Sequence, residues 1–344
     1  MHEAMLYEKL PESVTRCFLC EHRCVIRPGR RGICEVRENQ EGTLYTLVYG
    51  MVISRAVDPI EKKPLYHFLP GSTSYSFATP GCNFRCRFCQ NAEISQMPRL
   101  SEFWGQELAS PRELVADAQR LGCLSISYTY TEPTIYFEFA YDVMQEARKA
   151  GLRNVWVTNG FMTRECLDLI APEDQSRRLL DAANVDLKAW NDSFYRRYVG
   201  ARLDPVLQSL RLMKERGVWV EVTTLLIPGL NDDEQELREL AAFIKEDLGE
   251  DTPWHVSRFH PSFELMDRPP TPLETLQLAR QIGLEAGLRY VYLGNVPGTG
   301  GEDTSCFSCG CSLLRRRGFR VLTDNVTEGC CPECGAEIAG IWEY

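Results

Sequence analysis

Three cysteines in the spacing C-x3-C-x2-C lie in the stretch Pro80-Gly81-Cys82-Asn83-Phe84-Arg85-Cys86-Arg87-Phe88-Cys89-Gln90-Asn91. With 15 cysteines in 344 residues, this spacing should arise by chance only about 0.03 times per chain. Thiolates hold iron–sulfur clusters, and a cubane of four irons takes four ligands. Three cysteines on one loop therefore leave one iron open, and an open metal position is where a substrate or cofactor binds. The alternative is a zinc knuckle that takes its fourth ligand from elsewhere.

Strand patterns and helical patterns alternate on the carboxyl side of this loop. β-rich runs predict strands at 74–78, 124–130, 155–158, 184–187, 219–226, 254–257 and 290–293. Apolar residues at three- and four-residue spacing predict helices at 111–121, 135–150, 163–170, 205–216, 232–248 and 272–286. Such alternation indicates an α/β fold with a parallel sheet and helices outside it. Six to seven units suit a full or partial (βα) barrel, with the three cysteines on the loop after its first strand.

Small cysteine-rich modules flank the predicted barrel. We expect an N-terminal module at 1–70, the barrel at 71–299 and a C-terminal module at 300–344. In the last of these, two C-x2-C pairs separated by 21 residues match the two knuckles of a zinc ribbon. Zinc is the first choice there, and rubredoxin-like iron is compatible with the same ligands. The four predicted ligands are Cys306, Cys309, Cys331 and Cys334.

The N-terminal module carries a second set of four thiols. These are Cys17, Cys20, Cys24 and Cys34, with His22 nearby. Four thiolates fit either a structural zinc or an auxiliary [4Fe–4S] cluster that relays electrons. We favour structural zinc, because small cysteine modules are more often structural than redox-active.

The cysteine loop and the segments around it resemble the radical SAM superfamily. The C-x3-C-x2-C loop has an aromatic residue, Phe88, before its last cysteine and follows the first strand of the predicted barrel. The chain is similar to the AmmeMemoRadiSam-system radical SAM enzymes, a branch related to pyruvate formate-lyase activating enzyme. The segments that carry this similarity are 17–34, 128–134, 157–160, 185–188, 223–232, 257–260 and the C-terminal cysteine pairs.

This resemblance implies a reaction and a site. In the superfamily, a [4Fe–4S] cluster on the three cysteines, here Cys82, Cys86 and Cys89, binds S-adenosyl-L-methionine and cleaves it to a 5′-deoxyadenosyl radical that abstracts hydrogen. Glu132, at a strand end facing the active side of a barrel, is expected to accept a hydrogen bond from the ammonium group of that cofactor. The other expected cofactor-binding residues are Phe88, Asn159, Lys188 and His260.

Several functions stay open at this point. The resemblance implies a radical SAM enzyme acting on a protein or small organic substrate, with Memo-like and AMMECR-type partners and a flavodoxin or ferredoxin reductant. A glycyl-radical-enzyme activating enzyme would use the same chemistry, whereas an iron–sulfur electron carrier or binding module would leave S-adenosylmethionine intact.

The composition of the chain bears on which partners it binds and on the cell compartment in which it works. The net charge of −10 disfavours nucleic acid, and the short basic run at 315–320 is interpreted as a solvated loop flank. No apolar run reaches the roughly 18 residues of a membrane span, and the first residues lack the pattern of a signal peptide. We therefore expect a cytoplasmic protein.

Overall fold

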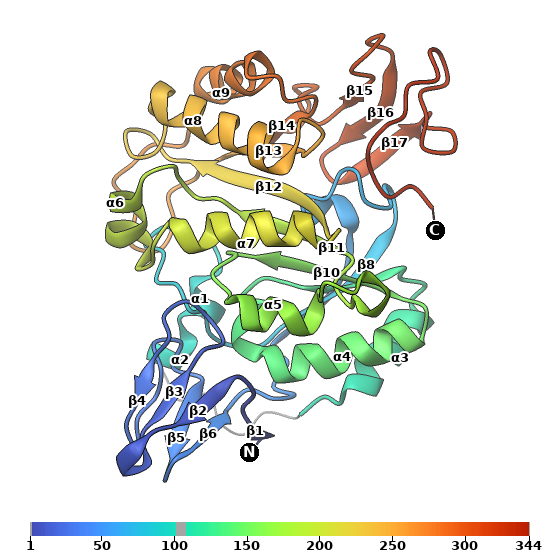
Figure 1. The fold of residues 1–344 in the computed structure, drawn as a ribbon. Helices are drawn as coiled ribbons and strands as arrows, with labels where there is room; N and C mark the ends of the chain where they lie inside the picture. The colour runs from blue at the N-terminus through green and yellow to red at the C-terminus, as the bar shows by residue number, and fades with distance from the viewer. Residues whose placement is uncertain (1, 101–107, 344) are drawn as a thin grey trace.

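The computed structural model describes residues 2–100 and 108–343, and its centre is one large sheet (Figure 1). Eight strands follow the order β14-β13-β12-β11-β10-β9-β8-β7. All neighbours from β8 to β14 are parallel, and β7 is antiparallel to β8. The strands are β7 (Ser54–Pro59), β8 (Thr73–Ala78), β9 (Ser125–Tyr128), β10 (Arg153–Thr158), β11 (Ala182–Asp186), β12 (Trp219–Leu226), β13 (Trp254–Arg258) and β14 (Val291–Gly294). Because β7 and β14 stand at the two ends of this order, the barrel is partial.

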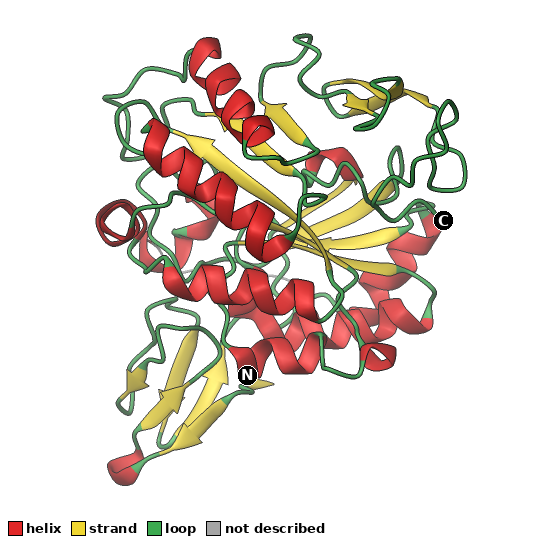
Figure 2. Cartoon of the chain, turned by 45° about the horizontal axis from the view of Figure 1, so that its top comes forward, coloured by secondary structure: helices red, strands yellow, loops and turns green. Residues whose placement is uncertain are grey.

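Helices cover the outer face of the strands, as Figure 2 shows. They begin at polar caps where the sequence supplies them, because a side-chain oxygen satisfies a free backbone N–H. Ser110 caps α3 in a capping box with Glu113, and Asp233 caps α8. The helices are α1 (Ala92–Ser95), α2 (Met97–Leu100), α3 (Pro111–Arg120), α4 (Phe137–Lys149), α5 (Arg164–Ile170), α6 (Asp192–Phe194), α7 (Asp204–Glu215), α8 (Glu234–Phe243) and α9 (Leu273–Glu285).

The predicted fold class is confirmed. Each of the seven expected strands and six expected helices corresponds to an element of the structure. The differences lie at the ends of elements: the helix expected at 232–248 is α8 followed by the π-helical turn Ile244–Leu248, and the one expected at 135–150 is α4 after the 3-10 turn Pro133–Tyr136. Strand β7 was not expected, and it places residues 54–59, inside the expected N-terminal module, in the large sheet.

The N-terminal module consists of two small antiparallel sheets at the lower left of Figure 1. One has the order β1-β6-β5 and the other β2-β3-β4. Arg37 on β5 forms a buried ion pair with Glu138 of α4, which fixes the module to the barrel. The strands are β1 (His2–Glu3), β2 (Tyr7–Lys9), β3 (Thr15–Cys17), β4 (Val25–Ile26), β5 (Arg37–Gln40) and β6 (Thr43–Thr46).

The C-terminal module covers the region between the two end strands of the large sheet. Its own sheet has the order β15 (Thr304–Ser305), β16 (Ser312–Arg317) and β17 (Arg320–Asp324). Near β14, the Leu293 amide donates to Gly301 at 2.9 Å, and beyond β7, the Leu69 amide donates to Ile341 at 2.7 Å. An uncovered edge exposes unpaired backbone groups, so this packing explains how a partial barrel is completed.

One sequence interpretation is wrong. Arg316, in the basic run taken as a solvated flank, is buried on β16. The run forms a strand in which side chains alternate between faces, so Arg315 and Arg317 are exposed while Arg316 points into the protein. Among the described helices, none is long and apolar enough to cross a membrane.

Candidate active site

A cavity of about 500 Å³ lies at the carboxyl ends of the parallel strands. The chain enters it after each of four consecutive strands, since parallel strands all end at the same edge of a barrel. The expected site residues that line it are Cys82, Cys86, Cys89, Phe88, Glu132, Asn159 and Lys188. The structure therefore brings together seven residues from segments spread over more than a hundred positions.

The central triplet, defined as Cys82, Cys86 and Cys89, is held on a loop with fixed backbone. The Arg85 amide donates to Val199 at 2.8 Å and the Arg87 amide donates to Tyr198 at 2.9 Å, which ties the loop to the π-helical turn after α6. None of the three triplet cysteines forms a disulfide. No fourth cysteine occurs among the described residues that line the cavity, so a cluster on these thiols keeps one open position.

Glu132 occupies the centre of a hydrogen-bond network at the base of the cavity. Its Oε1 accepts from the Thr158 hydroxyl at 2.7 Å and from the Thr134 amide at 3.0 Å, and its Oε2 accepts from the Asn159 amide at 2.8 Å. Burial raises the pKa of this carboxyl, while the Asn159 amide and the neighbouring hydroxyls oppose that shift. Glu132 also caps the turn Pro133–Tyr136, so it has a structural role as well as its place in the cavity wall.

Asn159 and Lys188 reach the triplet from two neighbouring strands. The Asn159 Nδ2 lies 2.7 Å from Asn83 Oδ1 and 3.9 Å from Cys82 Sγ. The Lys188 ammonium lies 2.9 Å from Asp186 and 5.9 Å from the centre of the Phe88 ring. Burial would lower the pKa of Lys188, but the Asp186 carboxylate raises it well above its usual value, so a fixed positive charge faces the cavity.

His260 is the one expected cofactor-binding residue that the structure does not bring into the cavity. Its side chain is exposed, and it is absent from the cavity lining. The loop that carries it does contact the backbone of the cysteine loop. The Glu264 amide donates to the backbone oxygen of Arg87 at 2.9 Å, and the Ser262 hydroxyl donates to the backbone oxygen of Cys89 at 3.1 Å.

Sequence reasoning missed Lys63 and Tyr130, which line the same cavity, and Asp58, whose carboxylate contacts both. The Lys63 ammonium, buried on the cavity wall, lies 2.6 Å from Asp58 of β7 and 4.5 Å from the centre of the Tyr130 ring. Burial lowers the pKa of Lys63 to about 8, although Asp58 opposes the shift. Tyr130 has a φ of 64°, a conformation uncommon outside glycine and frequent at functional sites. The sequence offered only the two adjacent lysines, Lys62 and Lys63, as a sign of this charged group. Two adjacent lysines match no known spacing of site residues.

The C-terminal thiol set, defined as Cys306, Cys309, Cys331 and Cys334, forms a compact cluster. Across residues 2–100 and 108–343 it is the one group of three or more potential ligands whose atoms all lie within 4.8 Å of one another. The sulfurs of Cys306 and Cys334 are 3.7 Å apart, as are those of Cys309 and Cys331. Zinc bound at about 2.3 Å in a tetrahedron separates its sulfurs by about 3.8 Å, so the set fits a single ion. Cys311, which is not one of the four predicted ligands, lies 3.3 Å from Cys331, measured between the two sulfurs.

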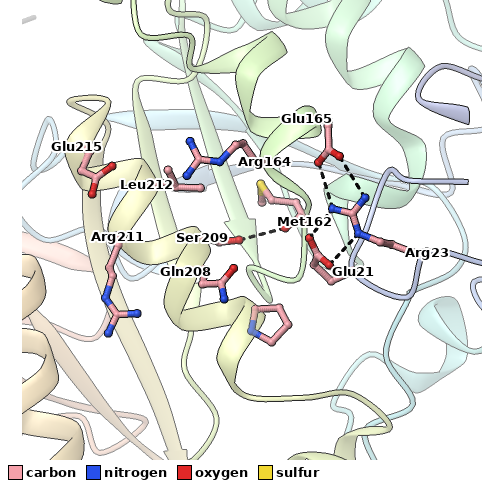
Figure 3. Close-up of a pocket in the computed structure, with 11 residues that line it drawn as sticks. Glu21, Arg23, Met162, Arg164, Glu165, Gln208, Ser209, Arg211, Leu212 and Glu215 are labelled. Carbon is pink, nitrogen blue, oxygen red and sulfur yellow. Dashed lines mark hydrogen bonds and ion pairs between the residues drawn. The ribbon is translucent and has the colours of Figure 1, made fainter.

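The N-terminal thiol set, defined as Cys17, Cys20, Cys24 and Cys34, lines a closed cavity beside the barrel. The loop from Cys20 to Cys24 is fastened to α5 by Arg23, which forms ion pairs with Glu21 and Glu165 (Figure 3). These charges belong to an open groove of about 430 Å³ between this loop, α5 and α7. The groove lies apart from the central triplet, and its paired charges explain the loop's position.

We compared the chain with family models, with curated proteins and with solved structures. Residues 76–241 match the family model described as the radical SAM superfamily. An uncharacterized protein of Methanocaldococcus jannaschii is 47% identical over 340 residues, which cover 98% of this chain and 99% of that protein. Pyruvate formate-lyase 1-activating enzyme of Escherichia coli is 24% identical over 168 residues, which cover 48% of this chain and 66% of the enzyme. Streptococcus suis SuiB with its precursor peptide is 15% identical, with a TM-score of 0.49 over 67% of this chain and 50% of SuiB.

Proposed function

We propose that this chain, which belongs to the radical SAM superfamily, is an enzyme that removes a hydrogen atom from a protein or small organic substrate. A reduced [4Fe–4S] cluster held by the central triplet would supply one electron to the sulfonium of bound S-adenosylmethionine, and cleavage of its C–S bond would give methionine and a 5′-deoxyadenosyl radical. The observation that carries the proposal is the central triplet at a cavity that also contains Glu132 and Lys188.

The residues present fit these groups. Three cysteines that form no disulfide, without a fourth cysteine among the described lining residues, suit a cluster with one open iron. The cavity of about 500 Å³ lies within the range of small-molecule sites. Beside Cys82, the buried Nδ2 of Asn83 has no hydrogen-bond partner, and a buried donor without a partner is costly unless a ligand satisfies it.

The protein's own contribution is charge and orientation. Glu132 presents a buried carboxylate fixed by backbone and hydroxyl donors, which suits an ammonium group. Lys188 holds a positive charge near Cys86 and Phe88, which suits a carboxylate or a negatively charged cluster. The two charges have opposite signs and enter the cavity from β9 and β11, so a zwitterionic amino acid group can be oriented between them.

We further propose that the enzyme works in the AmmeMemoRadiSam system, with Memo-like and AMMECR-type protein partners. The sequence resemblance described above supports this proposal, in particular the cysteine-bearing segments outside residues 76–241. A glycyl-radical-enzyme activating enzyme is the second candidate, which the similarity to pyruvate formate-lyase 1-activating enzyme favours. A cytoplasmic location stays a prediction, in keeping with the reduced state that three sets of free thiols require.

Anaerobic incubation of the reconstituted protein with S-adenosylmethionine and dithionite tests the core of the proposal. We expect 5′-deoxyadenosine from the parent and from Cys123→Ala, a matched control at a buried cysteine outside all three thiol sets. Cys86→Ala should produce none. An intact S-adenosylmethionine pool in the parent would favour the electron-carrier function instead.

The same reaction, repeated with candidate partners, separates the two enzyme functions. A mass change on a Memo-like or AMMECR-type protein, or on a small molecule bound to it, is expected for the proposed system. A glycyl radical on an added glycyl-radical enzyme, with no change on the other partners, would replace the system by the activating function.

A further inference from the structure

The N-terminal thiol set differs from the C-terminal set in the spacing of its sulfurs. In the C-terminal set all four sulfurs lie within 4.8 Å of one another, whereas no three of the N-terminal thiols meet this condition among the described residues. Instead, the N-terminal thiols line a cavity that admits a water-sized sphere. Sulfurs bound to one tetrahedral zinc ion lie about 3.8 Å apart, so the N-terminal set lacks the compact form of the C-terminal set.

The three sulfurs of the central triplet likewise form no such compact group among the described residues, and the family places a four-iron cubane on them. A cubane holds each thiolate on a different iron, so its sulfurs stand further apart than those on one ion. The molecule therefore contains one compact set that fits a single ion and two wide sets that fit a cluster.

One of the N-terminal thiols, Cys17, has a buried cation as its hydrogen-bond partner. Arg37, whose side chain is 1% exposed, donates from Nη1 to Cys17 Sγ at 3.2 Å. A guanidinium stays charged in proteins, and its buried hydrogen bond to sulfur favours the thiolate that binds metal. The rest of the cavity wall is largely apolar, with Leu19, Ile26, Ile33 and Ile135. Such a wall keeps water from a cluster.

The same loop contacts the central triplet directly. The His22 Nε2 lies 2.8 Å from the backbone oxygen of Asn83, the residue that follows Cys82. Because a carbonyl oxygen only accepts, the imidazole must donate from Nε2. The His22 ring also packs on Phe161 at 4.8 Å between ring centres, and Phe161 packs on Phe84 at 5.3 Å. Through these contacts the loop of the N-terminal thiols packs directly on the loop of the central triplet.

A second connection runs through the barrel wall. Ile135, which lines the N-terminal cavity, belongs to the turn Pro133–Tyr136 that Glu132 caps. Glu132 in turn lines the active-site cavity. The two cavities thus share one wall.

We propose that the N-terminal thiol set holds a second [4Fe–4S] cluster, placed to exchange electrons with the cluster on the central triplet. Each transfer moves one electron from the reduced N-terminal cluster to the oxidised central one. A low-potential one-electron donor protein of the flavodoxin or ferredoxin class restores the N-terminal cluster. The sequence favoured zinc for these thiols; the sulfur spacing and the His22 contact favour iron. This inference rests on the proposed function of the central triplet.

Metal content of the anaerobically purified, reconstituted parent protein gives the first test. Two four-iron clusters and one zinc ion correspond to about eight irons and one zinc per chain. About four irons and two zinc ions per chain would overturn the proposal. This measurement needs no variant, so it stands even where a cysteine substitution prevents folding.

Two matched variants then separate the two clusters. A triplet variant (Cys82→Ala, Cys86→Ala and Cys89→Ala) and an N-terminal variant (Cys20→Ala and Cys24→Ala) should each keep about four irons, and Cys123→Ala should keep about eight. An iron-free triplet variant would refute the N-terminal cluster. An iron-free N-terminal variant beside an iron-loaded triplet variant would instead refute the proposed function, so the two failures are distinguishable.

Electron paramagnetic resonance tests the placement. In the dithionite-reduced parent, the signals of the two clusters should broaden or split through magnetic interaction, because the His22 loop holds them close. The signals of the two single-cluster variants should lack this interaction. A parent spectrum equal to the sum of the two variant spectra would refute electron exchange over a short path.

Discussion

Replacing Arg316 by methionine should destabilise the junction between the C-terminal module and the barrel by about 3–5 kcal/mol. The Arg316 side chain is fully buried, as is that of Glu61, 3.8 Å away. The Arg316 guanidinium donates to the backbone oxygen of Tyr66 at 2.7 Å and to Thr304 Oγ1 at 2.8 Å. Methionine fills most of the volume but donates nothing. Loss of two or three hydrogen bonds at about 1 kcal/mol each, together with an unpaired buried carboxylate, gives this magnitude.

The loss of stability in Arg316→Met should depend on pH, and the titration of Glu61 determines whether it grows or shrinks as the pH rises. Burial raises the pKa of Glu61, while the Arg316 charge opposes that rise. Without Arg316 the pKa rises further, so the folded protein retains a proton that the unfolded chain releases above about pH 4.5. Stability then falls as the pH rises through this window. The deficit of the variant should therefore be larger at pH 8 than at pH 5.

Urea unfolding at the two pH values measures this effect. Arg317→Met is the matched control, because Arg317 follows Arg316 on β16 and is exposed, and its cost should stay within about 0.5 kcal/mol. The double variant Arg316→Met with Glu61→Gln should regain part of the loss, since the amide leaves no buried charge. Overlapping unfolding curves for Arg316→Met and Arg317→Met would refute the reasoning.

Three further predictions follow from named contacts. Glu132→Gln should weaken S-adenosylmethionine binding at least tenfold in equilibrium dialysis, because a neutral amide loses the charge that an ammonium group requires; an unchanged Kd would contradict the assignment. Burial lowers the pKa of His67 to about 4, so stability should fall by up to roughly 3 kcal/mol as the pH drops from about 6.5 to about 4. The urea midpoint of His67→Gln should lack that fall, and equal slopes would exclude His67 as its cause. Cys306→Ser should increase hydrogen exchange across residues 301–343, because zinc supplies folding energy to such modules. The control Cys330→Ser should leave the exchange unchanged. Equal protection in both variants would contradict the role of a bound metal in folding this module.

Periodicity predicted the large sheet because its signal is local. Strand β12 is found at 219–226 as expected, since its residues are mostly β-branched, aromatic or apolar. Strand β7 carried no such signal, because Ser54–Pro59 is half-exposed and includes Arg55 and Asp58. Its extended backbone depends on antiparallel pairing with β8, which no window of sequence contains.

The candidate site divides in the same way. Glu132, Asn159 and Lys188 were identified from the family resemblance, and each also follows a parallel strand, whose end meets the others at one edge. Lys63 and Tyr130 were missed, because their contact joins the segment after β7 to the turn after β9. The burial of Arg316 was likewise hidden, since a run of arginines gives no sign of which face packs on Tyr66.

The sequence by itself determined the chemistry: cysteines two to four residues apart on one loop must present several thiols to the same point, whatever surrounds them. The tertiary structure decided what the separate loops do together. Cys34 joins Cys17, Cys20 and Cys24 only because β3 to β5 fold back on one another, and the distance between their sulfurs follows from that packing. The same holds for the charges of Arg37 and Arg316, because the cost of burying a charge depends on the partner that packing places beside it.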